Sequence, residues 1–156
     1  MIFYYLSTMF YDLIYFSHST GTIHIKEMNL ILAKSRFRNA DQGVTGFLVY
    51  VEGIFDDHTE GRFLQVLEGS KKDVTEIYDS IKKDPRHHQV TTIKEGPLEI
   101  RNFNCWRMGY ESFNVQEFPD LQFFFQLDIQ PLIYHDDHHP MLDFIKSFAV
   151  TGKNIR

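Results

Sequence analysis

The chain has 156 residues, a length typical of one domain with a short extension. Hydrophobic residues make up 43% and charged residues 24%, which excludes an intrinsically disordered chain. Acidic residues outnumber basic ones by 21 to 16, and this balance argues against a protein that binds duplex nucleic acid directly. The single cysteine, Cys105, excludes an internal disulfide, and no apolar run is long enough to span a membrane. We therefore expect a cytoplasmic protein, and we interpret the apolar residues 1–10 as mature chain because they lack the basic region of a signal peptide.

The order of the predicted elements indicates an α+β fold. Strands are predicted where β-branched and aromatic residues gather between turn signals, and helices where apolar residues recur three and four positions apart. A turn is predicted at 39–43 after the first helix, and Asp84-Pro85 ends the second. In chain order the elements are a strand at 12–17, a helix at 22–37, strands at 44–51 and 62–68, a helix at 72–83, and strands at 89–95 and 103–110. This β-α-β-β-α-β-β order predicts a ferredoxin-like sandwich, a five-stranded mixed sheet with two helices on one face.

The sequence changes character after Glu111. Residues 118–134 are rich in Phe, and residues 141–149 have the apolar spacing of an amphipathic helix. We therefore divide the chain into a domain at 1–110 and a C-terminal helical extension at 111–156 that packs on it. The three phenylalanines at 123–125 would dock this extension on the sheet or on a second subunit.

Tyr15, Gln65 and Asn39 are polar residues that need an explanation. Strand alternation places Tyr15 and Gln65 within apolar rows, and an amide buried without a partner costs about 1–3 kcal/mol. The two side chains can satisfy each other if both strands are central, with Asn39 at the rim of the same face. From the residues alone, a structural hydroxyl–amide pair and a helix-capping Asn are favoured over a functional site.

Five segments, taken together and in order, resemble a known family. They are LIYFS at 13–17, RNADQGVTGFLVY at 38–50, FLQVLEG at 63–69, DPRHH at 84–88 and NFNCWRM at 102–108. The chain from about residue 11 to 110 is in this way similar to the BLUF domain, a flavin-binding blue-light sensor. Each segment is weak evidence alone, and the specificity lies in their order.

The resemblance implies a role for each matching residue. Tyr15 would donate an electron and then a proton to the excited flavin, and Gln65 would switch its hydrogen bonds between that phenol and the flavin. Asn39 would bind the pyrimidine edge of the ring, while Trp106 and Met108 would relay the signal. The other residues implied to contact the cofactor are Ile31, Leu32 and Ile81, which would enclose the ring, and Asp84, Arg86 and His87 near its tail.

The resemblance also implies a function: a blue-light photoreceptor, not an enzyme, with noncovalently bound FAD. FAD is preferred to FMN only because of the resemblance. Because few residues follow Tyr110, the signal would pass through the C-terminal region to a downstream signalling protein or to a homo-oligomer. Two alternatives stay open. One is a ferredoxin-like module that binds a small ligand or oligomerises without sensing light. The other is an acylphosphatase-type hydrolase, which would need a phosphate-binding glycine loop, and residues 19–21 are a poor candidate for such a loop.

Four features depart from the family or suggest other chemistry. Arg38 replaces an Asn that members often carry, and we expect it to face solvent. The loop predicted at 52–62 is longer than usual and holds acidic residues and a histidine, as does the segment HDDHH at 135–139. Nothing in the sequence holds the side chains of either segment in the geometry of a metal site. We therefore predict an acidic hairpin tip at 52–62, a solvated turn at 135–139 and no metal site. Cys105 is expected to be a buried, inert thiol.

Overall fold

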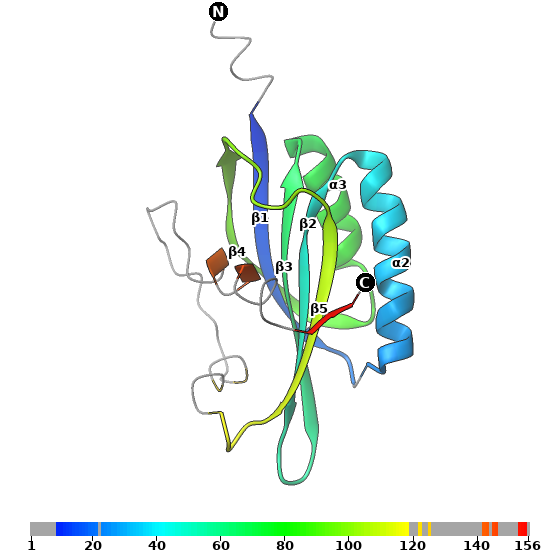
Figure 1. The fold of residues 1–156 in the computed structure, drawn as a ribbon, viewed down its shortest axis with the longest axis vertical. Coiled ribbons are helices and arrows are strands. Elements are labelled where there is room, and N and C mark those ends of the chain that lie inside the picture. Colours follow the sequence, from blue (N-terminus) through cyan, green and yellow to red (C-terminus); the bar gives the residue numbers. More distant parts are fainter. Residues whose placement is uncertain are drawn as a thin grey trace, which may run out of the picture.

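The computed structural model describes residues 9–21 and 23–118, Gln122, Phe125, and residues 142–143, 145–146 and 153–155. Its elements in chain order are β1 (Phe10–Ser19), α2 (Ile25–Gln42), β2 (Thr45–Ile54), β3 (Thr59–Gly69), α3 (Lys71–Lys82), β4 (His87–Leu98), β5 (Trp106–Asn114) and β6 (Lys153–Ile155). The strands form one mixed sheet in the order β4-β1-β3-β2-β5-β6. Helices α2 and α3 lie side by side on one face of this sheet (Figure 1).

The predicted ferredoxin-like α+β arrangement is confirmed, with one additional strand. The short β6 pairs antiparallel with β5 across Met108–Tyr110, so the sheet has six strands and not five. The expected C-terminal helices are not confirmed: in the described part of the extension, α-helical residues occur at 142–143 and 145–146 and 3-10 helical residues at 122 and 125. The segments at 123–124 and 135–139 lie outside the described residues. No helix in the described part is long and apolar enough to cross a membrane.

The first helix is longer than predicted. The turn expected at 39–43 is wrong, because α2 continues to Gln42 and therefore contains Asn39. No glycine or proline interrupts 38–42, and the helix ends only where Gly43 adopts a φ of +68°. This left-handed conformation is the usual helix terminator, since glycine adopts it without steric cost.

The hairpin between β2 and β3 is also more regular than predicted. The expected loop at 52–62 consists mostly of strand, because the antiparallel pairing extends to Ile54 and Thr59. Only residues 55–58 form the connection, closed by a hydrogen bond of 2.8 Å from Phe55 N to His58 O, and the His58 ring stacks on the Phe55 ring. In the described part of the chain, no three His, Cys, Asp or Glu side chains are grouped to hold a metal.

The sheet separates two hydrophobic clusters. Alternation along β1 sends Leu13 and Tyr15 towards the helices and Ile14 and Phe16 to the opposite face. The helix-side cluster also takes up Met28, Ile31, Val74, Ile77 and Tyr78 from the two helices. On the opposite face, Leu142 and Ile145 belong to the cluster, with Phe125 packed against it. Both faces of the central strands are therefore buried.

Candidate functional site

A cavity opens between the sheet and the two helices. Its walls include aliphatic side chains of both helices, its base carries a tyrosine and an amide from the sheet, and charged groups lie among its remaining residues. The lining residues are Tyr15, Ile31, Lys34, Ser35, Leu48, Phe63, Gln65, Ile77, Ser80, Ile81, Asp84, Arg86 and His87. Apolar walls with a few convergent polar groups are typical of a cofactor site.

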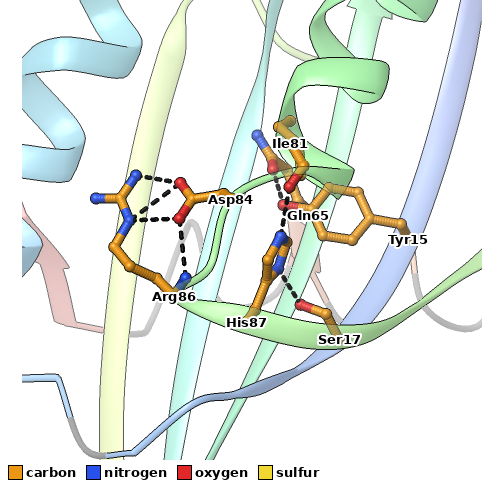
Figure 2. A network of polar contacts seen from close by, with 7 residues as sticks. All are labelled: Tyr15, Ser17, Gln65, Ile81, Asp84, Arg86 and His87. Carbon is orange, nitrogen blue, oxygen red and sulfur yellow. Dashed lines mark hydrogen bonds and ion pairs between the residues drawn. The ribbon is translucent and has the colours of Figure 1, made fainter.

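Tyr15 and Gln65 meet at the base of this cavity. They are directly opposite each other in the β1–β3 ladder, and each side chain is only 3% exposed. The Tyr15 hydroxyl donates a hydrogen bond to Gln65 Oε1 (Figure 2). The pairing that strand alternation predicted is therefore present, and the amide oxygen is satisfied by the phenol.

The surroundings of Tyr15 keep its hydroxyl protonated. Burial raises the pKa of Tyr15 above its usual value, and the nearby Tyr78 and Asp84 raise this pKa further. The Tyr15 ring stacks on Tyr78 with centroids 5.5 Å apart, and His87 approaches it edge-on at 6.1 Å. The phenol is thus a fixed hydrogen-bond donor towards Gln65.

Asp84 and Arg86 form a rigid ion pair immediately after α3. The guanidinium Nε donates to both carboxylate oxygens, at 2.9 and 3.0 Å, and the Arg86 main-chain N–H donates to Oδ1 at 2.9 Å. A third side-chain bond joins Arg86 Nη2 to Asp84 Oδ2. These hydrogen bonds lower the pKa of Asp84 and raise that of Arg86. The pair remains charged at neutral pH.

His87 is held by two partners. Its Nε2 lies 2.6 Å from the Ile81 carbonyl oxygen and its Nδ1 lies 2.7 Å from the Ser17 hydroxyl (Figure 2). Because a carbonyl oxygen can only accept, Nε2 carries a proton, and in the neutral ring Nδ1 accepts from Ser17. His87 therefore links the C-terminal end of α3 to β1 beside Tyr15.

Most of the predicted site residues line the cavity. Seven of them do so: Tyr15, Ile31, Gln65, Ile81, Asp84, Arg86 and His87. Leu32 and Asn39 lie on α2, but their side chains, like that of Arg38, fall outside the described part of the structure. The place expected for Asn39, just past the helix, is wrong because α2 includes it.

Sequence reasoning did not include the other lining residues. Ile77 lies one turn before Ile81, and Lys34 and Ser35 lie one turn after Ile31, so helical spacing could have identified them. Ser17, the partner of His87, is two residues after Tyr15 and shares its sheet face. The contact between Ser17 and His87 could not be found this way, because it joins β1 to β4.

Trp106 and Met108 lie in the helix-side cluster but do not line the cavity. Met108 shares a row across the sheet with Gln65, because both are register partners of Leu48. Trp106 pairs instead with Gly46, two residues earlier in each strand. Both side chains are buried in this cluster.

The expectation for Cys105 was wrong, because this thiol is exposed. β5 begins only at Trp106, so Cys105 lies in a bend where strand alternation does not apply.

A ferredoxin-like sheet with a buried Tyr–Gln pair under a two-helix cavity defines a small α+β domain with a ligand-binding cavity. A sequence model of the BLUF family, described as sensors of blue light using FAD, matches residues 10–109. The chain belongs to the BLUF family and is a flavin-binding blue-light sensor.

Similar proteins include longer proteins whose names describe regulation by light. The chain is 37% identical over 89 residues to photoactivated adenylate cyclase subunit beta of Euglena gracilis. This match covers 57% of this chain and 9% of that protein. It is 29% identical over 108 residues to the blue light- and temperature-regulated antirepressor BluF of Escherichia coli, covering 69% of this chain and 24% of that protein. The chain thus spans about a tenth of the cyclase subunit's length and a quarter of the antirepressor's.

Solved structures agree with this assignment. The dark-state structure of the BLUF protein BlrB has a TM-score of 0.58 and 26% identity, with 74% of this chain and 83% of that one covered. The photo-activated state of BlsA has a TM-score of 0.62 at 22% identity and covers 95% of this chain and 99% of that chain, which supports the fold.

Proposed function

We propose that this chain is a blue-light photoreceptor that binds FAD noncovalently in the cavity and senses light through Tyr15 and Gln65. The observation that carries the proposal is the buried hydrogen bond from the Tyr15 hydroxyl to Gln65 Oε1 at the base of the cavity. FAD is preferred to FMN because the family is described by its use of FAD.

The lining residues fit a flavin. Ile31, Ile77 and Ile81 offer apolar surface to a flat ring, while the Gln65 amide offers a hydrogen-bonding edge. Lys34 and Arg86 are cations suited to the phosphates of the cofactor's tail. When bound, the flavin supplies light absorption and an oxidising excited state.

The two photoactive residues have distinct tasks. Tyr15 has an oxidisable phenol, and its hydroxyl proton already points along a hydrogen bond to Gln65. This arrangement suits a residue that donates first an electron and then a proton. Gln65 has one acceptor oxygen and an NH₂ donor, so rotation or tautomerisation of the amide exchanges what it offers to the cavity. Such an exchange alters the hydrogen bonds of the ligand, and hence its colour, while the backbone stays in place.

The signal would leave the site through β5. Met108 and Gln65 flank Leu48 in neighbouring strands, and Trp106 is buried two residues before Met108. Both side chains are therefore close enough to respond to a change at the Gln65 amide. β5 pairs with β6 near the C-terminus, which gives the C-terminal region a direct connection to the sensor. We infer that the output is an interaction with a downstream cytoplasmic signalling protein or a homo-oligomer, and that residues 1–110 sense and 111–156 transmit, without catalysis by this domain.

The test is a light-minus-dark absorption spectrum of the purified protein and of Tyr15→Phe. The wild type should be yellow and show a small red shift under blue light that reverses in the dark, whereas Tyr15→Phe should bind flavin without shifting. Tyr78→Phe is the matched control, because it removes a neighbouring phenol that bonds to Thr92 and not to Gln65. A Tyr15→Phe variant that shifts normally would refute the role of Tyr15. A wild type that takes up no flavin, or does not respond to light, would favour the alternative of a light-independent ligand-binding or oligomerisation module.

A further inference from the structure

Glu68 is a fully buried carboxylate on the sheet face opposite the cavity. It is register partner to Asp12, which is also fully buried, so two carboxylates lie side by side across β1 and β3. Lys94 Nζ pairs with Asp12 Oδ2 at 2.6 Å, and Asp12 Oδ1 has no hydrogen-bond partner among the residues that the structure describes. Burying a second carboxylate here is costly unless it is fully hydrogen-bonded. Specific hydrogen bonds must therefore offset the cost of burying Glu68.

Among the described residues, all side-chain hydrogen bonds of Glu68 come from the connection between β4 and β5. Its Oε1 accepts from the main-chain N–H groups of Asn102 and Phe103, at 2.9 and 2.8 Å. Its Oε2 accepts from Asn102 Nδ2 at 2.8 Å and from the Asn102 main chain at 3.1 Å. The main-chain N–H groups of Asn102 and Phe103 and the Asn102 side-chain amide thus all donate to the Glu68 carboxyl group.

Arg101 ties the same connection to neighbouring strands. Its guanidinium donates to the Glu68 main-chain oxygen at 3.0 Å and to Thr45 Oγ1 at 2.7 Å. A further bond of 2.9 Å reaches the Gly43 carbonyl. Residues 101–103 are therefore fixed at the end of β3 and the start of β2.

This anchor lies directly before β5. Phe103 is buried, Asn104 and Cys105 are exposed, and the next residue in the chain is the buried Trp106. Between the anchor and Trp106 one further recorded main-chain bond holds the chain, from Gly46 N to Cys105 O at 3.2 Å. The position at which β5 enters the sheet thus depends on Glu68 together with the β2 pairing.

We propose that Glu68 is a positioning residue of the light signal: it fixes the start of β5 through Asn102 and Phe103 and so holds Trp106 in its buried place. The inference rests on the proposed function, because β5 is the strand through which a change at Gln65 would be read. Glu68 and Gln65 both belong to β3, so the strand that carries the switching amide also carries the anchor of the responding strand.

Trp106 gives this inference a specific readout. It is the one tryptophan of the chain, so intrinsic tryptophan fluorescence reports on this residue alone. Glu68→Gln keeps the size of the side chain but replaces one acceptor oxygen with an NH₂ donor, which cannot accept from Asn102. In the dark, flavin-bound protein we expect a red-shifted emission and roughly a doubling of the acrylamide quenching constant, because loss of burial exposes the indole to the quencher. Dark recovery after blue light should also change, while the dark flavin spectrum stays that of the wild type.

Lys94→Met is the matched control. It removes the partner of Asp12 on the same face and lowers stability without touching the β4–β5 connection, so the fluorescence of Trp106 should stay that of the wild type. Unchanged quenching in Glu68→Gln, or an equal change in Lys94→Met, would show that Glu68 is only structural and overturn the inference.

A second variant keeps the test decisive if Glu68→Gln fails to hold flavin. Asn102→Asp places a carboxylate where Nδ2 donates to Glu68, and repulsion should displace the connection and expose Trp106 in the same direction. Wild-type quenching in this variant would refute the anchor. A wild type without any light response would defeat the proposed function alone, because the quenching comparison in the dark tests the anchor independently.

Discussion

Gln65 and Glu68 lie three residues apart on β3 and are buried on opposite faces of the sheet. Gln65 accepts from Tyr15 beneath the cavity, and Glu68 accepts from the connection that leads into β5. Val66 and Leu67 between them are fully buried, so this part of β3 is tightly packed. A change at Gln65 is therefore expected to act through side-chain contacts towards β5, and not through a shift of β3 itself.

Replacing Gln65 by Leu should abolish the light-induced shift and also lower stability. The substitution leaves the buried Tyr15 hydroxyl without its acceptor, which costs about 1–3 kcal/mol in the free energy of unfolding. Urea unfolding in the dark measures this loss, and light-minus-dark absorption measures the shift.

The double variant Tyr15→Phe/Gln65→Leu is the control for this coupling. With both polar groups removed, no hydroxyl remains unsatisfied, so the double variant should lose less stability than the sum of the two single variants. Additive losses would show that the hydrogen bond does not couple the two residues.

Gly46→Ala should prevent correct pairing of β2 with β3. An added Cβ would lie 1.9 Å from the Val66 carbonyl oxygen, and the φ of +155° at Gly46 is one that side chains rarely adopt. We expect insoluble protein or a loss of about 3 kcal/mol or more in the free energy of unfolding, as for other severe backbone clashes.

Gly96→Ala is the matched control for this clash. A Cβ at Gly96 meets nothing within 4 Å, and its backbone needs no positive φ, so stability should change little. Similar losses in both variants, measured by thermal unfolding, would contradict the role assigned to the close approach at Gly46.

The sequence was sufficient for the parts of the site that depend on local periodicity. Alternation along two strands placed Tyr15 and Gln65 in apolar rows that could meet on one face, and helical spacing placed Ile31 and Ile81 on the apolar faces of their helices. The order of the predicted strands and helices indicated the ferredoxin-like fold, and the family resemblance added the expectation that these residues surround a flavin.

The errors arose where a boundary or a partner depends on distant residues. The turn predicted at 39–43 began too early, because the helix meets no strong stop signal before Gly43 and therefore continues through Asn39. Glu68 received no role, because its partner Asn102 is 34 residues away and nothing local indicates that its carboxylate is buried. Cys105 was placed inside a strand that in fact begins one residue later.

Asp84 should stabilise the protein in a way that is lost in acid. Its pKa is lowered below the ordinary 3.8, mainly by the hydrogen bond from Arg86, so the folded state binds this proton less readily than the unfolded state. The stabilisation is present above pH 3.8 and disappears as the pH falls through the lowered value. Asp84→Asn should remove this pH dependence, which urea unfolding across acidic pH would measure. Parallel curves for the variant and the wild type would contradict the assignment.

Glu68 should have the opposite pH dependence. Burial raises its pKa above the ordinary 4.5, and the nearby Asp12 raises it further, while the hydrogen bonds from Asn102 and Phe103 oppose the increase. The folded state therefore holds this proton more tightly than the unfolded state, so the contribution of Glu68 to stability is greatest below pH 4.5 and declines as the pH rises through the raised value. The cations near the two carboxylates are Lys94, which pairs with Asp12, and Arg101, which donates to the Glu68 main-chain oxygen.

Glu68→Gln removes the titrating group and should flatten this decline. Because Asp84 is intact in both proteins, the difference between the unfolding free energies of wild type and Glu68→Gln isolates the carboxyl. We expect the wild type to lose stability relative to the variant as the pH rises from 4.5, in urea unfolding series at fixed ionic strength. A difference that stays constant with pH would mean that Glu68 binds its proton equally in the folded and unfolded chains, and its burial beside Asp12 would then have no effect on its ionisation.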